Sequence, residues 1–280
     1  AWRHTDKGTA QQSRIPLIME KYLEEEIFEE YLDSYIYVER TLNSGLIRRG
    51  LIGMLDLDAY DFHKGSQAAV RATEATIESR IPARVEVRSQ AALEFPHVLL
   101  LADDDQDELL DAFNDSKSAM PLLYSFDLME DGGHISGWLV NDTHALALED
   151  RLNSYIANVP FKYEDLNEKS LVFAVGDGNH SLAAAKALWE QVKTDLSESE
   201  WTSCPARYAL VEIVNIHDAS LQFEPIHRIL FDTDVDKILK ELESVCTQDE
   251  GYPIEWKTKD KNGTIKLDPQ KGELACAILQ

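Results

Sequence analysis

The sequence predicts an α+β protein, a mixed sheet with flanking helices. Strand-like and helix-like segments follow one another along the whole chain, and no internal repeat occurs. Residues 121–142 have the pattern of a β-hairpin, in which two apolar segments flank Asp131-Gly132-Gly133, a turn that suits positive φ. A hairpin together with strands that lead into helices indicates a sheet with both antiparallel and parallel neighbours.

The first half of the chain is expected to contain a long helix and several strands. Residues 15–44 are expected to be helical, because apolar side chains recur mostly every three or four positions among glutamates. Residues 50–61 alternate like a strand that ends in a turn. The segment 83–88 also alternates, which would place Arg84, Glu86 and Arg88 on one face of a strand. Residues 97–113 read as a buried strand, an acidic helix start and a helix.

The second half alternates helices and strands. After the hairpin, Asp142 or Thr143 is expected to begin a helix that carries residues 144–156. Residues 170–175 read as a strand, 176–181 as a turn and 182–192 as a helix. Further on, a long strand, an apolar segment interrupted by Pro225 and an amphipathic helix are expected at 206–217, 221–231 and 234–245.

The length of 280 residues fits one large domain or two ordinary ones. Residues 1–14 are polar almost throughout and read as a tag remnant, or as a loop cut from a longer chain. We expect residues 15–280 to form one large α+β unit, with two lobes of about 15–140 and 141–280 as the alternative.

Composition narrows the classes of partner. The formal net charge of −24 argues against nucleic acid and against an anionic membrane surface, because both need a basic face. No apolar stretch approaches the length of a membrane helix. The three cysteines are widely spaced and form no CxxC motif, so we expect reduced thiols, a cytoplasmic location and no cysteine metal site.

The turn GDGNHS, residues 176–181, is the first candidate site. A glycine-bracketed turn at a helix start leaves backbone N–H groups unpaired at the positive end of the helix dipole, where an anion can bind. Gly176 and Gly178 would permit a sharp turn and close approach of a ligand. Asn179, His180 and Ser181 would add polar side chains, and Asp177 could act as a base or hold a metal ion. The alternative is an ordinary turn that caps a helix.

Further candidates lie elsewhere in the chain. Arginine is concentrated in residues 70–88 of a very acidic protein, and its fork binds phosphate or carboxylate bidentately. The plain alternative is a set of solvated surface ion pairs. The other positions singled out for an anion site or its chemistry are Arg71, Glu74, Arg84, Arg88, His227 and Arg228. The run Asp103–Asp105 after a strand could bind a metal, although such a run more often starts a helix.

Four long blocks resemble the bacterial and archaeal "domain of unknown function 1015" family: residues 70–104, 128–140, 175–186 and 204–231. The likeness covers roughly residues 20–240, and against that family the chain looks clipped at both ends. The element around 172–191 is also similar to the strand–turn–helix of the ParB and sulfiredoxin superfamily, which binds nucleotide phosphates and includes free-serine kinases. Asp177, Gly178 and His180 match that turn, whereas Ser181 stands where the superfamily has arginine.

The likeness implies a phosphate-handling or nucleotide-handling enzyme, such as a phosphotransferase, acting on a small, serine-like metabolite with ATP or another nucleotide and Mg²⁺. In that hypothesis Asp177 or Glu74 serves as base or magnesium ligand and His180 stabilises charge on the transferred group. Because Ser181 supplies no cation, the positive charge must come from arginines elsewhere. Two alternatives stay open: a nucleotide- or metabolite-binding regulator without chemistry, and a structural protein with no ligand.

Overall fold

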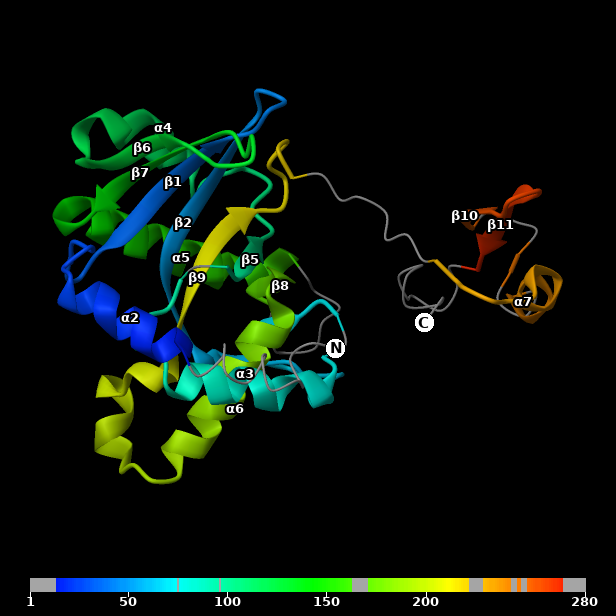
Figure 1. Cartoon of the computed structure of the whole chain (residues 1–280). Helices are drawn as coiled ribbons and strands as arrows, with labels where there is room; N and C mark the ends of the chain where they lie inside the picture. The colour runs from blue at the N-terminus through cyan, green and yellow to red at the C-terminus, as the bar shows by residue number, and fades with distance from the viewer. Residues whose placement is uncertain are drawn as a thin grey trace. The chain divides into compact units, whose positions relative to one another are not determined.

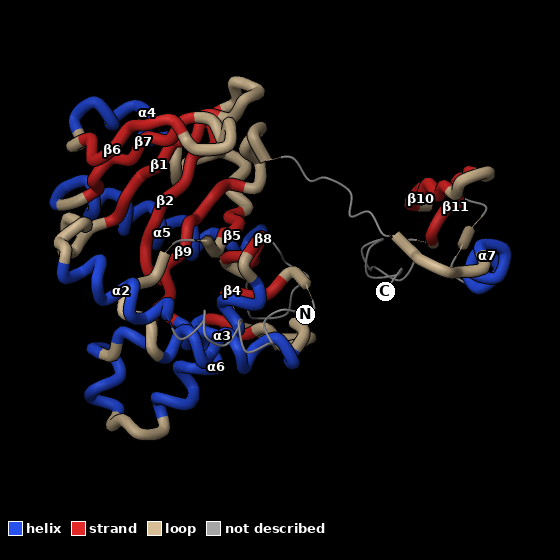
Figure 2. Tube along the Cα trace, viewed as in Figure 1, coloured by secondary structure: helices blue, strands red, loops and turns tan. Residues whose placement is uncertain are grey.

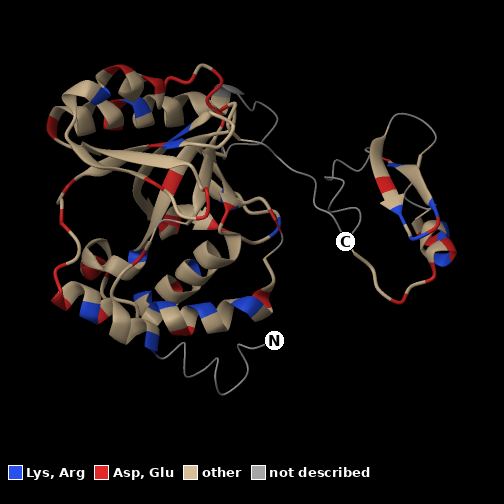
Figure 3. Ribbon diagram, turned by 45° about the horizontal axis from the view of Figure 1, so that its top comes forward, with Lys and Arg blue, Asp and Glu red and all other residues tan. Residues whose placement is uncertain are grey.

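The computed structural model describes residues 14–74, 76–95, 97–162, 171–221, 229–242, 246–247 and 251–268. By their internal contacts, the residues divide into two compact units, Ala1–Leu221 and Gln222–Gln280 (Figure 1). Within the described part of the chain, no helix has both the length and the apolar character needed to cross a bilayer. Acidic side chains are spread over the helices and loops of both units (Figure 3).

A nine-stranded mixed sheet forms the centre of the first unit, in the order β3-β4-β8-β5-β9-β2-β1-β7-β6 (Figure 2). Neighbours β3, β4 and β8 run parallel, as do β5 and β9, and the remaining pairs are antiparallel. This confirms the α+β class. The strands are β1 (Tyr35–Thr41), β2 (Ile47–Asp56), β3 (Tyr60–Asp61), β4 (Val70–Ala72), β5 (Leu99–Ala102), β6 (Leu122–Asp127), β7 (His134–Val140), β8 (Phe173–Asp177) and β9 (Tyr208–Asn215).

Helices pack around this sheet. Figure 1 shows α3 and α6 running together along one end of it, in agreement with their extensive mutual contacts. The α-helices of this unit are α2 (Arg14–Glu24), α3 (Ile81–Ser89), α4 (Asp111–Ser116), α5 (Asp142–Lys162) and α6 (Asn179–Lys193). Short 3₁₀ turns are η2 (Leu57–Ala59), η3 (Glu78–Arg80), η4 (Lys117–Ala119), η5 (Glu198–Ser203) and η6 (Pro205–Arg207).

The core of this unit is continuous from the hairpin end of the sheet to α6. Tyr37 is fully buried and lies opposite Leu51 on β2 and Trp138 on β7. Its ring also contacts Phe113 of α4, at 5.4 Å between centroids. At the other end, Trp189 of α6 is fully buried in the same cluster. The sheet and its helices therefore share one hydrophobic core, whose burial is the main stabilising term.

The expectation of helix across 15–44 is wrong beyond residue 24. Glu26 and Asp33 adopt positive φ, of 50° and 49°, which a continuing helix does not allow. The following segment, YIYVERT, is rich in aromatic and β-branched residues and pairs on both sides as β1. The helix was predicted too long because the apolar spacing among the glutamates continues past residue 24, where α2 ends.

The strand expected at 83–88 is also wrong, because these residues belong to helix α3. Pro82 lies in the first turn of this helix, where its missing N–H is not needed. Arg84 and Arg88 still share a face, but as i and i+4 on a helix, with Glu86 turned to another side. The strand and helix around 97–113, the 121–142 hairpin and the helix from Asp142 are confirmed. The strand and the helix on either side of 176–181 are also confirmed, but the turn between them is shorter than expected, because β8 extends to Asp177 and α6 begins at Asn179, which leaves only Gly178 between them.

The second unit contains α7 (Val235–Leu242) and the hairpin β10 (Tyr252–Lys257) and β11 (Asn262–Leu267). Asp234 caps α7, because its Oδ1 accepts from the N–H groups of Asp236 and Lys237, at 3.1 and 3.2 Å. Leu267 is fully buried, and its backbone pairs with that of Cys246 in an isolated antiparallel β-bridge. The amphipathic helix expected at 234–245 is thus present over its described residues.

Candidate functional site

The 176–181 turn joins β8 to α6 through a left-handed glycine. Gly178 has φ of 84° and is the N-cap residue of α6. A Cβ atom there would lie 2.9 Å from Val98 Cγ2 and 3.0 Å from the Val98 Cα atom. Both the backbone conformation and the space therefore require glycine. At Gly176 a Cβ atom would lie 2.7 Å from the side chain of Leu101.

The first turn of α6 begins directly at this glycine. Ser181 N and Leu182 N both donate to the Gly178 carbonyl at 2.9 Å, so intrahelical bonding starts there. Because the N-cap residue is a glycine, α6 has no hydrogen bond from an N-cap side chain to the N–H groups of its first turn. The neighbouring carboxylate of Asp177 accepts from Gly178 N at 2.7 Å. The helix start thus presents backbone donors next to an exposed carboxylate, and Ser181 lies half-buried one step further along.

Parallel pairing brings the end of β4 next to this turn. Arg71 pairs with Ala174, and Ala72 pairs with Val175, so Thr73 and Glu74 follow β4 at the edge where β8 ends. Carboxyl ends of parallel strands meet at the same edge of a sheet, which is where ligands of open α/β sheets bind. Arg71 itself donates from Nε to the Ala68 carbonyl at 2.7 Å.

Asn179 ties these two strand ends together. It is only 4% exposed. Its Oδ1 accepts from Thr73 N at 3.3 Å, and its Nδ2 donates to Thr73 Oγ1 and to the Val175 carbonyl, both at 3.4 Å. Thr73 Oγ1 also donates to the Val175 carbonyl at 2.5 Å. Asn179 is therefore a buried connector and not a ligand-facing donor.

His180 contacts the segment that follows β4 with both ring nitrogens. Its Nε2 accepts from the backbone N–H of Ile77 at 3.2 Å. Its Nδ1 lies 3.7 Å from Glu74 Oε1, and the His180 side chain is 15% exposed against 59% for Glu74. Glu74, Asp177 and His180 thus come together at one edge of the sheet, as three of the residues that the sequence singled out.

The arginines of α3 have other contacts. Arg88 forms a two-pronged ion pair with Glu94, in which Nη2 and Oε2 are 2.9 Å apart, and Nη2 also donates to the Tyr208 carbonyl at 3.2 Å. Arg84 donates to the Arg80 carbonyl at 3.0 Å. The fork of Arg88 therefore serves the packing of α3 against β9. His227 and Arg228 lie outside the described residues.

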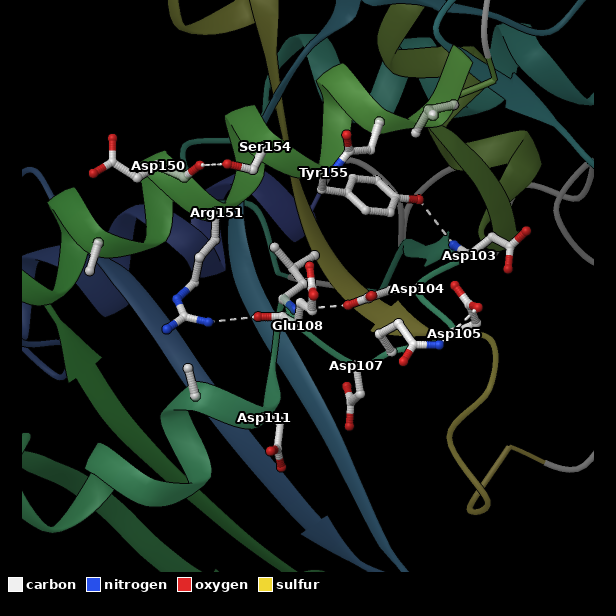
Figure 4. A pocket seen from close by; sticks show the side chains of 16 residues that line it. Asp103, Asp104, Asp105, Asp107, Glu108, Asp111, Asp150, Arg151, Ser154 and Tyr155 are labelled. Carbon is white, nitrogen blue, oxygen red and sulfur yellow. Dashed lines mark hydrogen bonds between the residues drawn. The ribbon is translucent and has the colours of Figure 1, made fainter. Parts of the chain in front are cut away.

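A second concave feature lies beside the carboxyl end of β5, where β5 and β9 run parallel (Figure 4). This acidic cleft has a volume of about 950 Å³ and is walled by the loop after β5, by α4 and by α5. Its acidic lining residues are Asp103, Asp104, Asp105, Asp107, Glu108, Asp111 and Asp150, and Arg151 brings a cation to the lining. Arg151 donates to the Glu108 carbonyl at 2.8 Å.

Several of these carboxylates have partners inside the fold. Arg49 pairs with Asp107 and, at 3.1 Å, with Asp111. Burial opposes the charge of Arg49, but Asp107 outweighs it and raises the pKa of Arg49 above its ordinary value. Asp104 Oδ2 accepts from Leu109 N at 2.8 Å and so holds the turns that precede α4, whose N-cap residue, Leu110, has no side-chain cap hydrogen bond. Among the residues that the structure describes, no three His, Cys, Asp or Glu side chains are arranged to hold a metal ion.

Sequence reasoning missed three contributors to these features. Thr73 and Ile77 reach the turn through backbone groups, for which side-chain type gives no signal. Tyr155 of α5 links the residue after β5 to the residue before β8. Its hydroxyl accepts from Asp103 N and donates to the Val172 carbonyl, both at 3.0 Å. For Thr73, the sequence signal was its position directly before the candidate residue Glu74.

The protein is thus an α+β protein with a mixed sheet, in which a helix begins at a left-handed glycine where two parallel strands end. The chain matches the family described as "Protein of unknown function (DUF1015)" over residues 3–275, and it belongs to that family. No curated protein and no solved structure gives a significant match. The likeness to the ParB and sulfiredoxin superfamily has no support from these comparisons and stays a prediction.

Proposed function

We propose that this protein handles the phosphate groups of a nucleotide at the 176–181 turn and passes a phosphoryl group to a small hydroxyl-bearing metabolite. One observation carries the proposal: Glu74, Asp177 and His180 meet the start of α6 at the edge where parallel strands β4 and β8 end. That edge is the usual ligand position of such sheets. A serine-like acceptor is the first to test.

Phosphate would bind to the backbone at the start of α6. The first N–H groups of a helix have no intrahelical acceptor, and the helix dipole adds partial positive charge there. Gly178 carries no side chain that would keep a phosphate away from these donors. Arg71 and Arg84 donate to backbone carbonyls and Arg88 is paired with Glu94, so in this proposal the positive charge comes from another source.

Magnesium would supply this charge. Mg²⁺ is usually held by one or two carboxylates together with substrate phosphates and water, not by a complete protein cage. Of the two carboxylates beside the helix start, Asp177 would hold the metal, and Glu74 would stay available for the proton. A site of this kind would not contain three preassembled protein ligands, so magnesium and nucleotide are expected to bind together.

The transfer would break the bond between the terminal phosphorus and its bridging oxygen in the nucleotide. The acceptor hydroxyl oxygen would form the new bond to phosphorus, and the nucleoside diphosphate would leave with the bridging electrons. The hydroxyl proton would pass to Glu74, whose carboxylate is the more exposed partner of the His180 pair.

A regulator that binds nucleotide without turnover is the second candidate. It is favoured by His180 Nε2, which already accepts a backbone N–H from Ile77 and so offers no free lone pair for chemistry. The two candidates share the ligand and differ in whether product forms. Loss of ATP and appearance of ADP in the presence of serine therefore separates them.

Thermal melting tests both candidates together. The full chain is melted with ATP, ADP, CTP, phosphoserine and serine, each with and without Mg²⁺, because a ligand that binds only the folded state raises the midpoint. We expect a rise with at least one nucleotide, dependent on Mg²⁺. The absence of any rise at millimolar ligand would refute phosphate handling for this set of ligands.

A further inference from the structure

The hydrogen bonds of His180 determine which of its ring nitrogens carries the proton. Ile77 N–H is a donor, so Nε2, at 3.2 Å, must be the acceptor and bear a lone pair. In a neutral imidazole the proton then belongs to Nδ1. Nδ1 is the nitrogen that lies 3.7 Å from Glu74 Oε1, so the N–H is directed to the side where a carboxylate stands.

We infer that His180 is a positioning residue, held as the Nδ1–H tautomer, and that it orients Glu74 instead of acting on the ligand itself. This inference rests on the proposed function for the role of Glu74, whereas the tautomer rests on the hydrogen bonds alone. It changes the role that the sequence suggested, in which His180 stabilises charge on the transferred group. A nitrogen that accepts a backbone N–H has no proton to donate and no free lone pair.

Exposure supports this division of roles. The His180 side chain is 15% exposed and lies between α6 and the segment after β4, whereas Glu74 is 59% exposed. Glu74 is thus the member of the pair that a ligand in solvent can reach. The 3.7 Å between Nδ1 and Oε1 is longer than a hydrogen bond, so the orienting of Glu74 by this N–H is what the inference adds to the observed contact.

Asn179 holds the other end of the same segment. Its buried carboxamide bonds Thr73 through both the backbone N–H and the hydroxyl. Consecutive residues of α6 therefore hold the chain on both sides of Glu74, at Thr73 and at Ile77. Two anchors around one exposed carboxylate are the arrangement expected for a group whose direction matters.

The test is the tautomer of His180 in the full wild-type chain. Long-range ¹H–¹⁵N correlation spectra of the imidazole are recorded at about pH 8, where imidazoles are ordinarily neutral. The His180→Gln spectrum assigns the resonances by their loss. We expect a pyrrole-type Nδ1 and a pyridine-type Nε2. A pyrrole-type Nε2, or two averaged nitrogens, overturns the inference.

Two near-isosteric variants test the two contacts separately. In His180→Gln the side-chain oxygen can still accept from Ile77 N–H, whereas His180→Asn is too short to reach it but can place an N–H near the position of Nδ1. We expect Ile77 amide exchange to be about tenfold faster in His180→Asn than in wild type, and nearly unchanged in His180→Gln. Equal Ile77 exchange in wild type and both variants contradicts the inference.

Failure of the proposed function would look different. If no nucleotide raises the melting midpoint but the Nδ1–H tautomer is found, the positioning geometry stands and phosphate handling falls. If nucleotide binds but the tautomer is Nε2–H, phosphate handling stands and the positioning role of His180 is wrong.

Discussion

At the scale of single residues, Gly178 is the position that sets the shape of the turn. Its φ of 84° and the 2.9–3.0 Å approach of Val98 leave no room for a side chain. We expect Gly178→Ala to lower the free energy of unfolding by more than the ~1–2 kcal/mol that a left-handed L-residue costs alone.

Gly65→Ala is the matched control, because Gly65 also has positive φ, of 80°, but a Cβ atom added there would have no neighbouring atom within 4 Å. Urea denaturation of both variants gives the difference. If Gly178→Ala and Gly65→Ala cost the same, close packing against Val98 contributes nothing.

Asn179 gives a second prediction at this scale. Replacing it by alanine removes its hydrogen bonds to Thr73 N, Thr73 Oγ1 and the Val175 carbonyl, whereas the bond from Thr73 Oγ1 to that carbonyl remains, so we expect a loss of about 0.5–1.5 kcal/mol for each bond that contributes. Ser181→Ala is the control, since Ser181 is its half-buried neighbour two positions on. Urea denaturation should show a clear loss for Asn179→Ala and a change within about 0.5 kcal/mol for Ser181→Ala; equal losses would mean that the Asn179 bonds are not stabilising.

At the scale of elements, η2 links the end of β2 to α6. Asp58 accepts from Trp189 Nε1 at 2.9 Å and from Lys193 Nζ at 2.8 Å, both on α6. Burial would raise the pKa of Asp58, but the bonds from Lys193 and Trp189 outweigh it, so the pKa lies below its ordinary value. This carboxylate therefore supports the folded state only while it is charged.

The sign of the pH dependence follows. A carboxyl pKa that is lower in the folded chain than in the unfolded chain stabilises the fold above the unfolded value, about 3.9, and this contribution is lost as the pH falls through the folded value. We expect Asp58→Asn to melt below wild type at pH 7 and the gap to narrow toward pH 3. Melting curves by circular dichroism at pH 7, 5, 4 and 3 measure it; a gap that stays constant contradicts the assignment.

The helix α3 supplies a prediction about arginine. Because Arg88 binds Glu94 and the Tyr208 carbonyl, we expect Arg88→Ala to destabilise the fold by about 1–3 kcal/mol and to leave any nucleotide-induced rise in the melting midpoint unchanged. Glu94→Gln is the matched partner variant. If nucleotide no longer raises the melting midpoint of Arg88→Ala but still raises that of Glu94→Gln, Arg88 binds the ligand and this prediction is wrong.

The elements that the sequence predicts best are those whose pattern is local. The hairpin at Asp131-Gly132-Gly133 and the helix after Gly178 follow from turn chemistry and apolar spacing. Residues 83–88 failed because a short alternating run fits a strand and a helix almost equally, and packing against α6 decides between them. The meeting of Glu74 with His180 depends on parallel pairing of β4 with β8, which no local pattern contains.

At the scale of the whole molecule, the core indicates which part folds as a unit. The buried cluster runs from Tyr37 to Val211, entirely within Ala1–Leu221. We expect a fragment of residues 1–221 to unfold in one cooperative transition, measured by differential scanning calorimetry with the full chain as control. A fragment without a cooperative transition would show that residues after 221 complete the fold.

The overall charge bears on the proposed ligand. A formal net charge of −24 repels a nucleotide, and two carboxylates stand at the turn itself. This negative charge opposes the attraction of phosphate to the backbone N–H groups at the start of α6. We therefore expect nucleotide to bind weakly without a divalent cation. If this turn handles phosphate, we expect Mg²⁺ and phosphate to bind jointly.

The most direct measurement is isothermal titration calorimetry of the full chain with Mg·ATP and with Mg·CTP, repeated for Asp177→Asn and with Mg²⁺ chelated. Asp177 lies at the helix start, and the change to asparagine keeps its shape while removing its charge. We expect wild type to bind at least one nucleotide, and chelation or Asp177→Asn to weaken this binding by about tenfold or more, roughly 1.4 kcal/mol. Equal affinity in wild type and Asp177→Asn, or no binding of either nucleotide, would contradict phosphate handling at this turn.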